Sequence, residues 1–186
     1  MSDALRWKLG ARHPGHDYRI FQTSFVDAAN PQTGELKRYS LIECVDWVNV
    51  IALTADDRVV LLKQYRAGVD EVCLEIPGGM IDPGEDPATA AARELVEETG
   101  YTAASWRHLG TVAPNPAIQT NRLHSYLALD ATQTSSPSPE GCEVLEVETA
   151  TLAAVRAMLR DGRIDHALVV VAFAHLAFEL EGLRRP

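Results

Sequence analysis

The chain has 186 residues, which is enough for one domain with a hydrophobic core and a small N-terminal addition. Its apolar fraction of 46% and charged fraction of 23% are ordinary for a globular protein. The net charge of −9 argues against a nucleic-acid partner, because phosphate backbones bind clustered Lys and Arg. The acidic excess indicates either a solvated surface or carboxylates gathered to hold cations.

The cysteines and the hydropathy of the chain predict a cytoplasmic protein. Cys44, Cys73 and Cys142 are odd in number, far apart and form no CxxC pair, which is typical of reduced thiols. No segment approaches the roughly 18 apolar residues that cross a bilayer. Residues 1–16 lack the apolar run of a signal peptide. We therefore expect no membrane partner.

The first half of the chain is rich in β-forming residues. Residues 1–16 contain Gly10, Pro14 and Gly15 and are expected to lack strong structure. Turn-forming residues then separate a series of β-rich runs. The expected strands cover residues 18–27, 36–43, 47–54 and 58–65, with one short strand within 67–83.

One central helix and two C-terminal helices complete the predicted elements. Asp86 can cap the central helix, Pro87 suits its first turn, and Gly100 ends it. Strands are expected at 106–112, 122–129 and 143–148, a polar loop at 130–141, and helices at 152–160 and 165–183. This order indicates a mixed sheet between helical layers.

Three glutamates of the central helix form the strongest chemical signal. Glu94, Glu97 and Glu98 are spaced i, i+3 and i+4, so they share one helix face with neighbouring Cβ atoms about 5–6 Å apart. Arg93 supplies only one positive charge against them. Carboxylates and a nearby glycine turn, which lets a backbone carbonyl approach, are suited to Mg²⁺. The alternative is a surface helix whose glutamates face water.

The segment GMIDPGEDPATAAARELVEETGY, residues 79–101, resembles the Nudix box, whose pattern is G-x5-E-x7-R-E-U-x-E-E-x-G-U with U a bulky aliphatic residue. Leu95 fills the first U, and Tyr101 departs from the last, which is a packing position. All seven specified positions match, and they are Gly79, Glu85, Arg93, Glu94, Glu97, Glu98 and Gly100. The resemblance therefore rests on seven residues at fixed spacing.

The resemblance implies a role for each residue and a fold. Glu94 and Glu98 would be the principal ligands of Mg²⁺ (or Mn²⁺), with Glu97 joining when more than one ion binds and the Gly78 carbonyl completing the set. Arg93 would pair with Glu85 and hold the loop against the helix. The metal ions would stabilise charge on a diphosphate and activate a water. The implied fold is an α/β/α sandwich with a mixed β-sheet and an N-terminal β extension.

The flanks resemble the ADP-ribose and nucleoside-diphosphate-sugar pyrophosphatase branch over residues 47–164. Pro116 occupies the place of a proline found beyond the box in that branch, but no acidic residue follows shortly after it. The substrate is therefore expected to be either ADP-ribose or a related nucleoside diphosphate sugar. Arg66 either contacts a phosphate or is an exposed strand-end arginine, and Trp47 either stacks on a base or packs at the sheet edge. The candidate substrate contacts are Trp47, Arg66, Pro116, Asn121 and Arg122.

The general base is expected from an acidic loop before a late strand, as in the resembling enzymes. Glu140 and Glu143 are the candidates, and Glu140 is the preferred one. The alternative is that both are loop carboxylates in water, with Glu94 or Glu97 activating the nucleophile.

The sequence as a whole predicts a metal-dependent hydrolase of two parts. Residues 1–45 would form an N-terminal segment whose β extension crosses to a partner in a homodimer, and residues 46–186 the Nudix hydrolase domain. The products would be a nucleoside monophosphate and a sugar phosphate. Two alternatives stay open: a hydrolase of dinucleoside polyphosphates, nucleoside triphosphates or capped RNA, and a non-catalytic sensor of nucleotide sugars. Sensors usually lose a box glutamate, and this chain keeps all of them.

Overall fold

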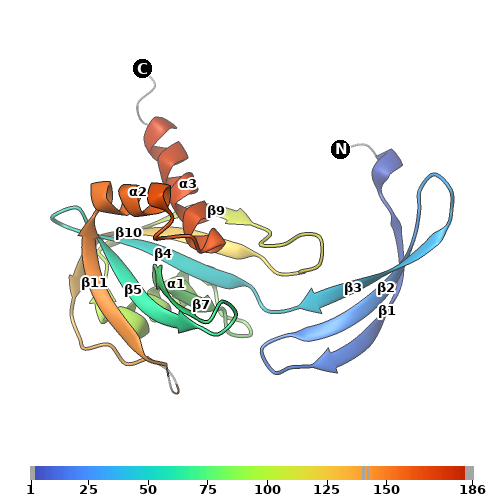
Figure 1. Cartoon of the computed structure of the whole chain (residues 1–186), viewed down its shortest axis with the longest axis horizontal. Helices are drawn as coiled ribbons and strands as arrows, with labels where there is room; N and C mark the ends of the chain where they lie inside the picture. Colours follow the sequence, from blue (N-terminus) through green and yellow to red (C-terminus); the bar gives the residue numbers. More distant parts are fainter. Residues whose placement is uncertain (1–2, 140, 142, 183–186) are drawn as a thin grey trace. The chain divides into compact units, whose positions relative to one another are not determined.

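The computed structural model describes residues 3–139, 141 and 143–182 (Figure 1). It contains two compact units. The N-terminal unit comprises the chain up to Val45 together with Ala113–Arg122, and the second unit comprises Asp46–Val112 and the chain from Leu123 onward. The segment 113–122 thus groups with the N-terminal strands, although it lies within the predicted range 46–186. The reason is backbone pairing: Ile42 N–H donates to the Ile118 carbonyl at 2.7 Å.

The secondary structure follows a β-rich first half and a helical C-terminus, as expected. In the described residues the elements are a 3-10 turn (Asp3–Leu5), β1 (Lys8–Asp17), β2 (Gln22–Ala29), β3 (Leu36–Glu43), β4 (Trp47–Thr54), β5 (Arg58–Arg66), β6 (Glu71–Glu75), β7 (Gly78–Met80), α1 (Pro87–Thr99), β8 (Tyr101–Thr102), β9 (Ser105–Val112), β10 (Leu123–Gln133), β11 (Leu145–Thr151), α2 (Leu152–Asp161) and α3 (Ala167–Gly182).

The N-terminal unit is built on a three-stranded antiparallel sheet in the order β1-β2-β3. The expectation that residues 1–16 lack strong structure is wrong, because Lys8–Asp17 forms a strand paired with β2. All ten of its residues are exposed, so the strand carries no apolar alternation that a sequence could reveal. Pro14 is tolerated because β1 lies at the edge of the sheet.

The second unit is an α/β/α sandwich around a mixed sheet. Its strand order, for the described residues, is β11-β5-β4-β10-β8, with β6 on β5, β7 on β4 and β9 on β10. Strands β4 and β10 are parallel, and the other pairs are antiparallel. Helix α1 packs on one face, and helices α2 and α3 pack on the other (Figure 1). The predicted fold class is confirmed.

Alternating residues of β4 build the two halves of the core. Val48 and Val50 pack with Leu95 of α1, whereas Ile51 packs with Val155 of α2 and with residues of α3. These side chains are almost fully buried, so each is worth about 1.5–3 kcal/mol of hydrophobic stabilisation. The sheet therefore forms a rigid platform between the helices. No helix in the described part of the chain is long and apolar enough to cross a lipid bilayer.

Two strand boundaries differ from the sequence expectation. Strand β10 continues to Gln133 because its last residues pair with β8, as in Gln133↔Tyr101. Strand β11 begins at Leu145, where it pairs with Gln64 of β5. In both cases a partner distant in the sequence sets the limits of the strand, and local propensity does not.

Helix α1 begins and ends as predicted. The Asp86 side chain accepts hydrogen bonds from the backbone N–H groups of Ala88 and Thr89. Gly100 ends the helix with φ of 73°, and its N–H donates to the Val96 carbonyl at 2.8 Å. These caps fix the direction in which the glutamate face of the helix points.

Gly100→Ala is expected to destabilise the fold by about 2–4 kcal/mol, because it combines left-handed strain with a steric clash. The added Cβ would overlap the Ser135 carbonyl oxygen. Chemical denaturation measures the loss. Gly162→Ala is the matched control, since Gly162 caps α2 at a φ of 81° with no atom within 4 Å of an added Cβ. Equal losses in the two variants would show that the backbone strain alone accounts for the effect.

Candidate active site

The glycine turn before α1 brings the chain close against the carboxylates. Strand β7 pairs with β4 through Gly79↔Val48 and Gly78↔Asn49. A Cβ on Gly79 would lie 2.6 Å from the carboxyl carbon of Glu94. With any other residue at this position the Glu94 carboxylate would have to shift, because real Cβ atoms do not approach other atoms so closely. The first glycine of the predicted motif thus admits the Glu94 carboxylate.

Arg93 ties this turn to the helix. Its Nε and Nη2 each donate to Glu85 at 3.0 Å, and Nη2 also donates to the Met80 carbonyl at 3.0 Å. Its Nη1 donates to Glu94 at 2.9 Å and to Glu97 at 3.0 Å. The Glu85 contact is the one that the motif implied. The contacts to Glu94 and Glu97 show that the same guanidinium also orients two of the candidate metal ligands.

Glu98 is the buried carboxylate of the cluster. It is 5% exposed, and its Oε2 accepts a hydrogen bond from the Gly78 N–H at 2.8 Å. Burial raises the pKa of Glu98 to about 8, and the negative charges of Glu94 and Glu143 act in the same direction. Burial also raises the pKa of Glu94, against the opposing charge of Arg93. Burial therefore disfavours the charged forms of Glu94 and Glu98, which a bound cation would favour.

The residues present fit a hard divalent cation. All the donors are oxygens, which suits Mg²⁺ or Mn²⁺, and the buried charge of Glu98 has no cationic hydrogen-bond partner among the described residues. No three acidic, histidine or cysteine side chains in the described ranges converge on one point. The reason is that Glu94 and Glu97 turn toward Arg93, while Glu98 turns toward Gly78. A bound cation would take the place of the Arg93 and Gly78 contacts of these carboxylates.

Arg66 and Glu143 join the cluster from other elements. Arg66, the last residue of β5, lowers the pKa of Glu98 through its charge. Glu143 lies exposed just before β11, and its charge raises the pKa values of Glu94 and Glu98. Arg66 ends β5 with a partly exposed side chain, and its contact with a phosphate stays a prediction. The site combines carboxylates with the guanidinium groups of Arg93 and Arg66, an arrangement suited to a metal-bound diphosphate.

Comparison with known proteins decides the family. Residues 46–173 match the family model of the NUDIX domain. The chain belongs to the Nudix family. Together with the relatives below, this makes it an enzyme of the Nudix hydrolase class.

Relatives and a solved structure agree with this assignment. The chain is 31% identical to CMP-5'-(N-acetyl-N-hydroxy-3-aminopropyl)phosphonate hydrolase of Streptomyces rubellomurinus over 86% of this chain and 76% of that protein. It is 30% identical to ADP-ribose pyrophosphatase of Bacillus subtilis over 56% of each. A crystal structure of an ADP compounds hydrolase superposes with a TM-score of 0.84 at 25% identity, covering 100% of both chains.

The other candidate substrate contacts and the second candidate base of this Nudix protein lie outside the glutamate cluster or outside the described residues. Trp47 begins β4 and is half-buried, paired with Leu123 of β10 and Met80 of β7. Pro116, Asn121 and Arg122 belong to the segment that groups with the N-terminal sheet, and their substrate contacts stay predictions. Glu140 lies outside the described residues.

Sequence reasoning missed Glu75, which holds Arg66 with two hydrogen bonds of 2.7 and 2.8 Å. The sequence feature that could have indicated it is an acidic residue between the apolar residues Leu74 and Ile76, at the end of a short strand. A lone carboxylate in such a strand needs a partner if it is buried.

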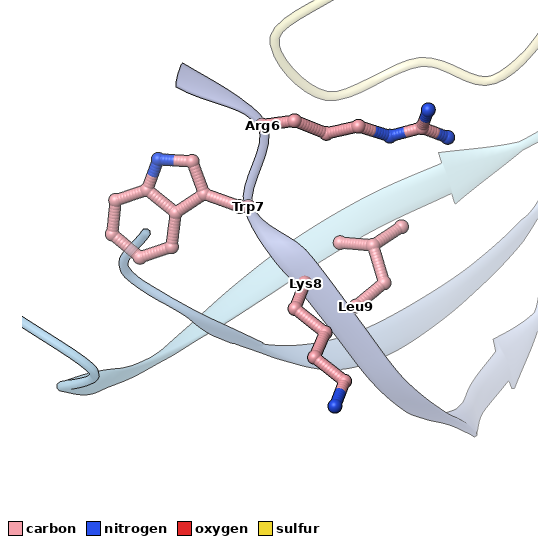
Figure 2. Close-up of a pocket in the computed structure, with 4 residues that line it drawn as sticks. All are labelled: Arg6, Trp7, Lys8 and Leu9. Carbon is pink, nitrogen blue, oxygen red and sulfur yellow. The ribbon is translucent and has the colours of Figure 1, made fainter. Parts of the chain in front are cut away.

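A hollow on the N-terminal unit holds none of the Nudix box residues. It is lined by Arg6, Trp7, Lys8 and Leu9 (Figure 2). The Trp7 ring meets the Tyr39 ring edge-on at 5.7 Å between centroids. Its described lining contains no carboxylate, so these four residues do not supply the ligands that the hydrolytic chemistry needs.

Proposed function

We propose that this Nudix hydrolase cleaves the diphosphate of ADP-ribose or a related nucleoside diphosphate sugar, giving a nucleoside monophosphate and a sugar phosphate. The observation that carries the proposal is the desolvated carboxylate cluster around Glu98 with the Arg66 guanidinium beside it. The ADP-ribose pyrophosphatase relative and the likeness to an ADP compounds hydrolase support this substrate class.

Glu94 and Glu98 would hold Mg²⁺ or Mn²⁺, with Glu97 as a further ligand and the Gly78 carbonyl completing the set. A bound divalent cation would neutralise charge that develops on the diphosphate and lower the pKa of an attacking water. Arg93 keeps Glu94 and the loop in place through its bonds to Glu85 and Met80. Arg66 would orient the diphosphate. Water oxygen then bonds to one phosphorus, and the bond from that phosphorus to the bridging oxygen breaks.

Glu143 would accept the proton of the attacking water. It is exposed and electrostatically linked to Glu94, Glu98 and Arg66, so it combines access to solvent with closeness to the cluster. Glu140, the other candidate, precedes it by three residues in the same loop. We therefore propose Glu143, whose position the structure describes, whereas Glu140, the candidate preferred on the sequence, lies outside the described residues.

Glu143→Gln is expected to lower kcat by about 10²–10⁴, the usual contribution of a general base. Steady-state hydrolysis of ADP-ribose with Mg²⁺ measures it. Glu146→Gln is the control, because Glu146 pairs with Lys63 on the surface of the same strand region and should change kcat less than about twofold. If Glu143→Gln and Glu140→Gln each keep normal turnover, the loop supplies no base.

A substrate panel tests the proposed function. ADP-ribose, GDP-mannose, UDP-glucose, a diadenosine polyphosphate and the nucleoside triphosphates are each incubated with the protein and Mg²⁺ or EDTA. Released monophosphates are detected with a coupled phosphatase. The proposal predicts metal-dependent turnover concentrated on ADP-ribose or another nucleotide sugar. Turnover concentrated on triphosphates or dinucleoside polyphosphates would overturn the substrate assignment.

We further propose a cytoplasmic homodimer. Large apolar side chains on the N-terminal strands and their turns are at least one-third exposed, and they include Leu9, Tyr18, Ile20, Phe25 and Leu36. Burying them against a second copy would remove apolar surface from water. Light scattering at micromolar protein is expected to give the mass of two subunits, and the mass of one would contradict the dimer.

A further inference from the structure

Glu75, the last residue of β6, is a buried carboxylate that the hydrolytic reaction does not itself require. It is 4% exposed, and its two oxygens accept from Nε and Nη2 of Arg66 at 2.7 and 2.8 Å. Burying a carboxylate is costly unless a charged partner satisfies it. The two-pronged contact meets this need and fixes the plane of the guanidinium. Glu75 therefore sets the orientation of Arg66.

Among the described residues, the contact with Glu75 leaves Nη1 of Arg66 free. Its side chain is 42% exposed, and Nη1 has no hydrogen-bond partner within the part of the chain that the structure describes. The charges of Glu98 and Glu143 act on this guanidinium. A guanidinium that is held along one edge keeps donors on the other edge for phosphate oxygens. The outer edge of Arg66 is thus available to a ligand at the cluster.

The residue that precedes helix α3 also lies close to Glu75. His166 directly precedes α3, and its Nδ1 lies 3.5 Å from Oε2 of Glu75. Asn49 of β4 donates from Nδ2 to the Leu168 carbonyl at 2.9 Å, which fastens the beginning of α3 to the sheet. Glu75 is therefore enclosed between β5 and the start of α3. Its carboxylate has little freedom to follow Arg66 if the arginine moves, so the arginine stays where Glu75 holds it.

We propose that Glu75 is a positioning residue of the hydrolase, which aims the free edge of Arg66 at the substrate diphosphate. This inference rests on the proposed function, since it assumes that a diphosphate binds at the box glutamates. The competing explanation is a purely structural ion pair. The two differ in one respect: a positioning residue acts through Arg66, so its effect on substrate binding disappears when Arg66 is absent.

A double-mutant cycle tests this dependence. The dissociation constant of a non-hydrolysable α,β-methylene analogue of ADP-ribose is measured by calorimetry with Mg²⁺ for wild type, Glu75→Gln, Arg66→Ala and the double variant. Glu75→Gln is expected to weaken binding about tenfold and to raise KM for ADP-ribose by a similar factor, with kcat changed less than about threefold. The double variant should bind no more weakly than Arg66→Ala alone. Unchanged binding by Glu75→Gln, or losses that add in the double variant, would overturn the proposal.

Two further variants keep the test decisive. Glu148→Gln removes one partner of the surface ion pair at Lys63 and should leave binding unchanged. If Glu75→Gln does not fold, Glu75→Asp keeps the buried charge and withdraws it from Arg66 by one methylene group. Glu75→Asp is then expected to weaken binding at an unaltered melting temperature, and wild-type affinity would contradict the inference. Wild-type hydrolysis of ADP-ribose is scored separately, so a failure of the proposed function is recognised independently of Glu75.

Discussion

Glu98→Gln is expected to lower kcat/KM for ADP-ribose by about 10³ or more, because it removes the charge of a principal metal ligand at the most buried point of the cluster. Glutamine keeps the size of the side chain and an oxygen that can accept the Gly78 N–H. The fold should therefore persist. Steady-state hydrolysis with Mg²⁺ measures the loss. Glu179→Gln, which breaks a partly exposed ion pair with Arg107, is the matched control and should retain full activity.

The same substitution should stabilise the metal-free protein at alkaline pH. The pKa of Glu98 is raised from 4.5 to about 8, so the folded state binds more protons than the unfolded chain between these values. The stability of the metal-free wild type therefore falls as pH rises from about 4.5 to 8, and Glu98→Gln removes this loss. We expect the variant to be up to about 5 kcal/mol more stable at pH 8.5 and about equal at pH 4. A variant that is less stable than wild type at pH 8.5 would contradict the uncompensated burial of the Glu98 charge.

Gly79→Ala is expected to lower kcat/KM by about 10², even though it adds only one methyl group. The Cβ would lie 2.6 Å from the carboxyl carbon of Glu94, so either this carboxylate or the β7 backbone must move. A displaced ligand loses its place at the metal site. Hydrolysis of ADP-ribose over a range of Mg²⁺ concentrations measures the effect, and the Mg²⁺ required for half-maximal rate should rise.

Gly68→Ala is the control for this glycine. No atom lies within 4 Å of a Cβ added there, and Gly68 has no left-handed φ. Its activity should equal that of the wild type. Wild-type activity in Gly79→Ala as well would show that Glu94 has room to move without loss, which would remove Gly79 from the account of the site.

The box and its helix could be predicted because their determinants are local. Asp86 and Gly100 fix the ends of α1, and the spacing of Glu94, Glu97 and Glu98 places them on one face without reference to the rest of the chain. The pairing of Arg93 with Glu85, which the resemblance to the Nudix box implied, joins residues eight positions apart. Such short-range relations survive in any fold that contains this loop and helix.

Features set by long-range pairing could not be predicted. Strand β1 carries no burial pattern and exists because β2 pairs with it. Segment 113–122 groups with the N-terminal strands through Ile42, which is remote in the sequence. The Glu75–Arg66 contact joins residues only nine positions apart, but it could not be predicted because its importance depends on the burial of Glu75. Sequence spacing alone reveals neither burial nor register.

The most direct test of the account is the identity of the products from ADP-ribose. The wild-type protein and Glu98→Gln are incubated with ADP-ribose and Mg²⁺, with EDTA as the metal-free control, and the products are separated by anion-exchange chromatography. We expect AMP and ribose 5-phosphate in equal amounts from the wild type with Mg²⁺, and neither with EDTA or with Glu98→Gln. Intact ADP-ribose that is bound tightly but never cleaved by the wild type would contradict hydrolysis and identify the protein as a nucleotide-sugar sensor.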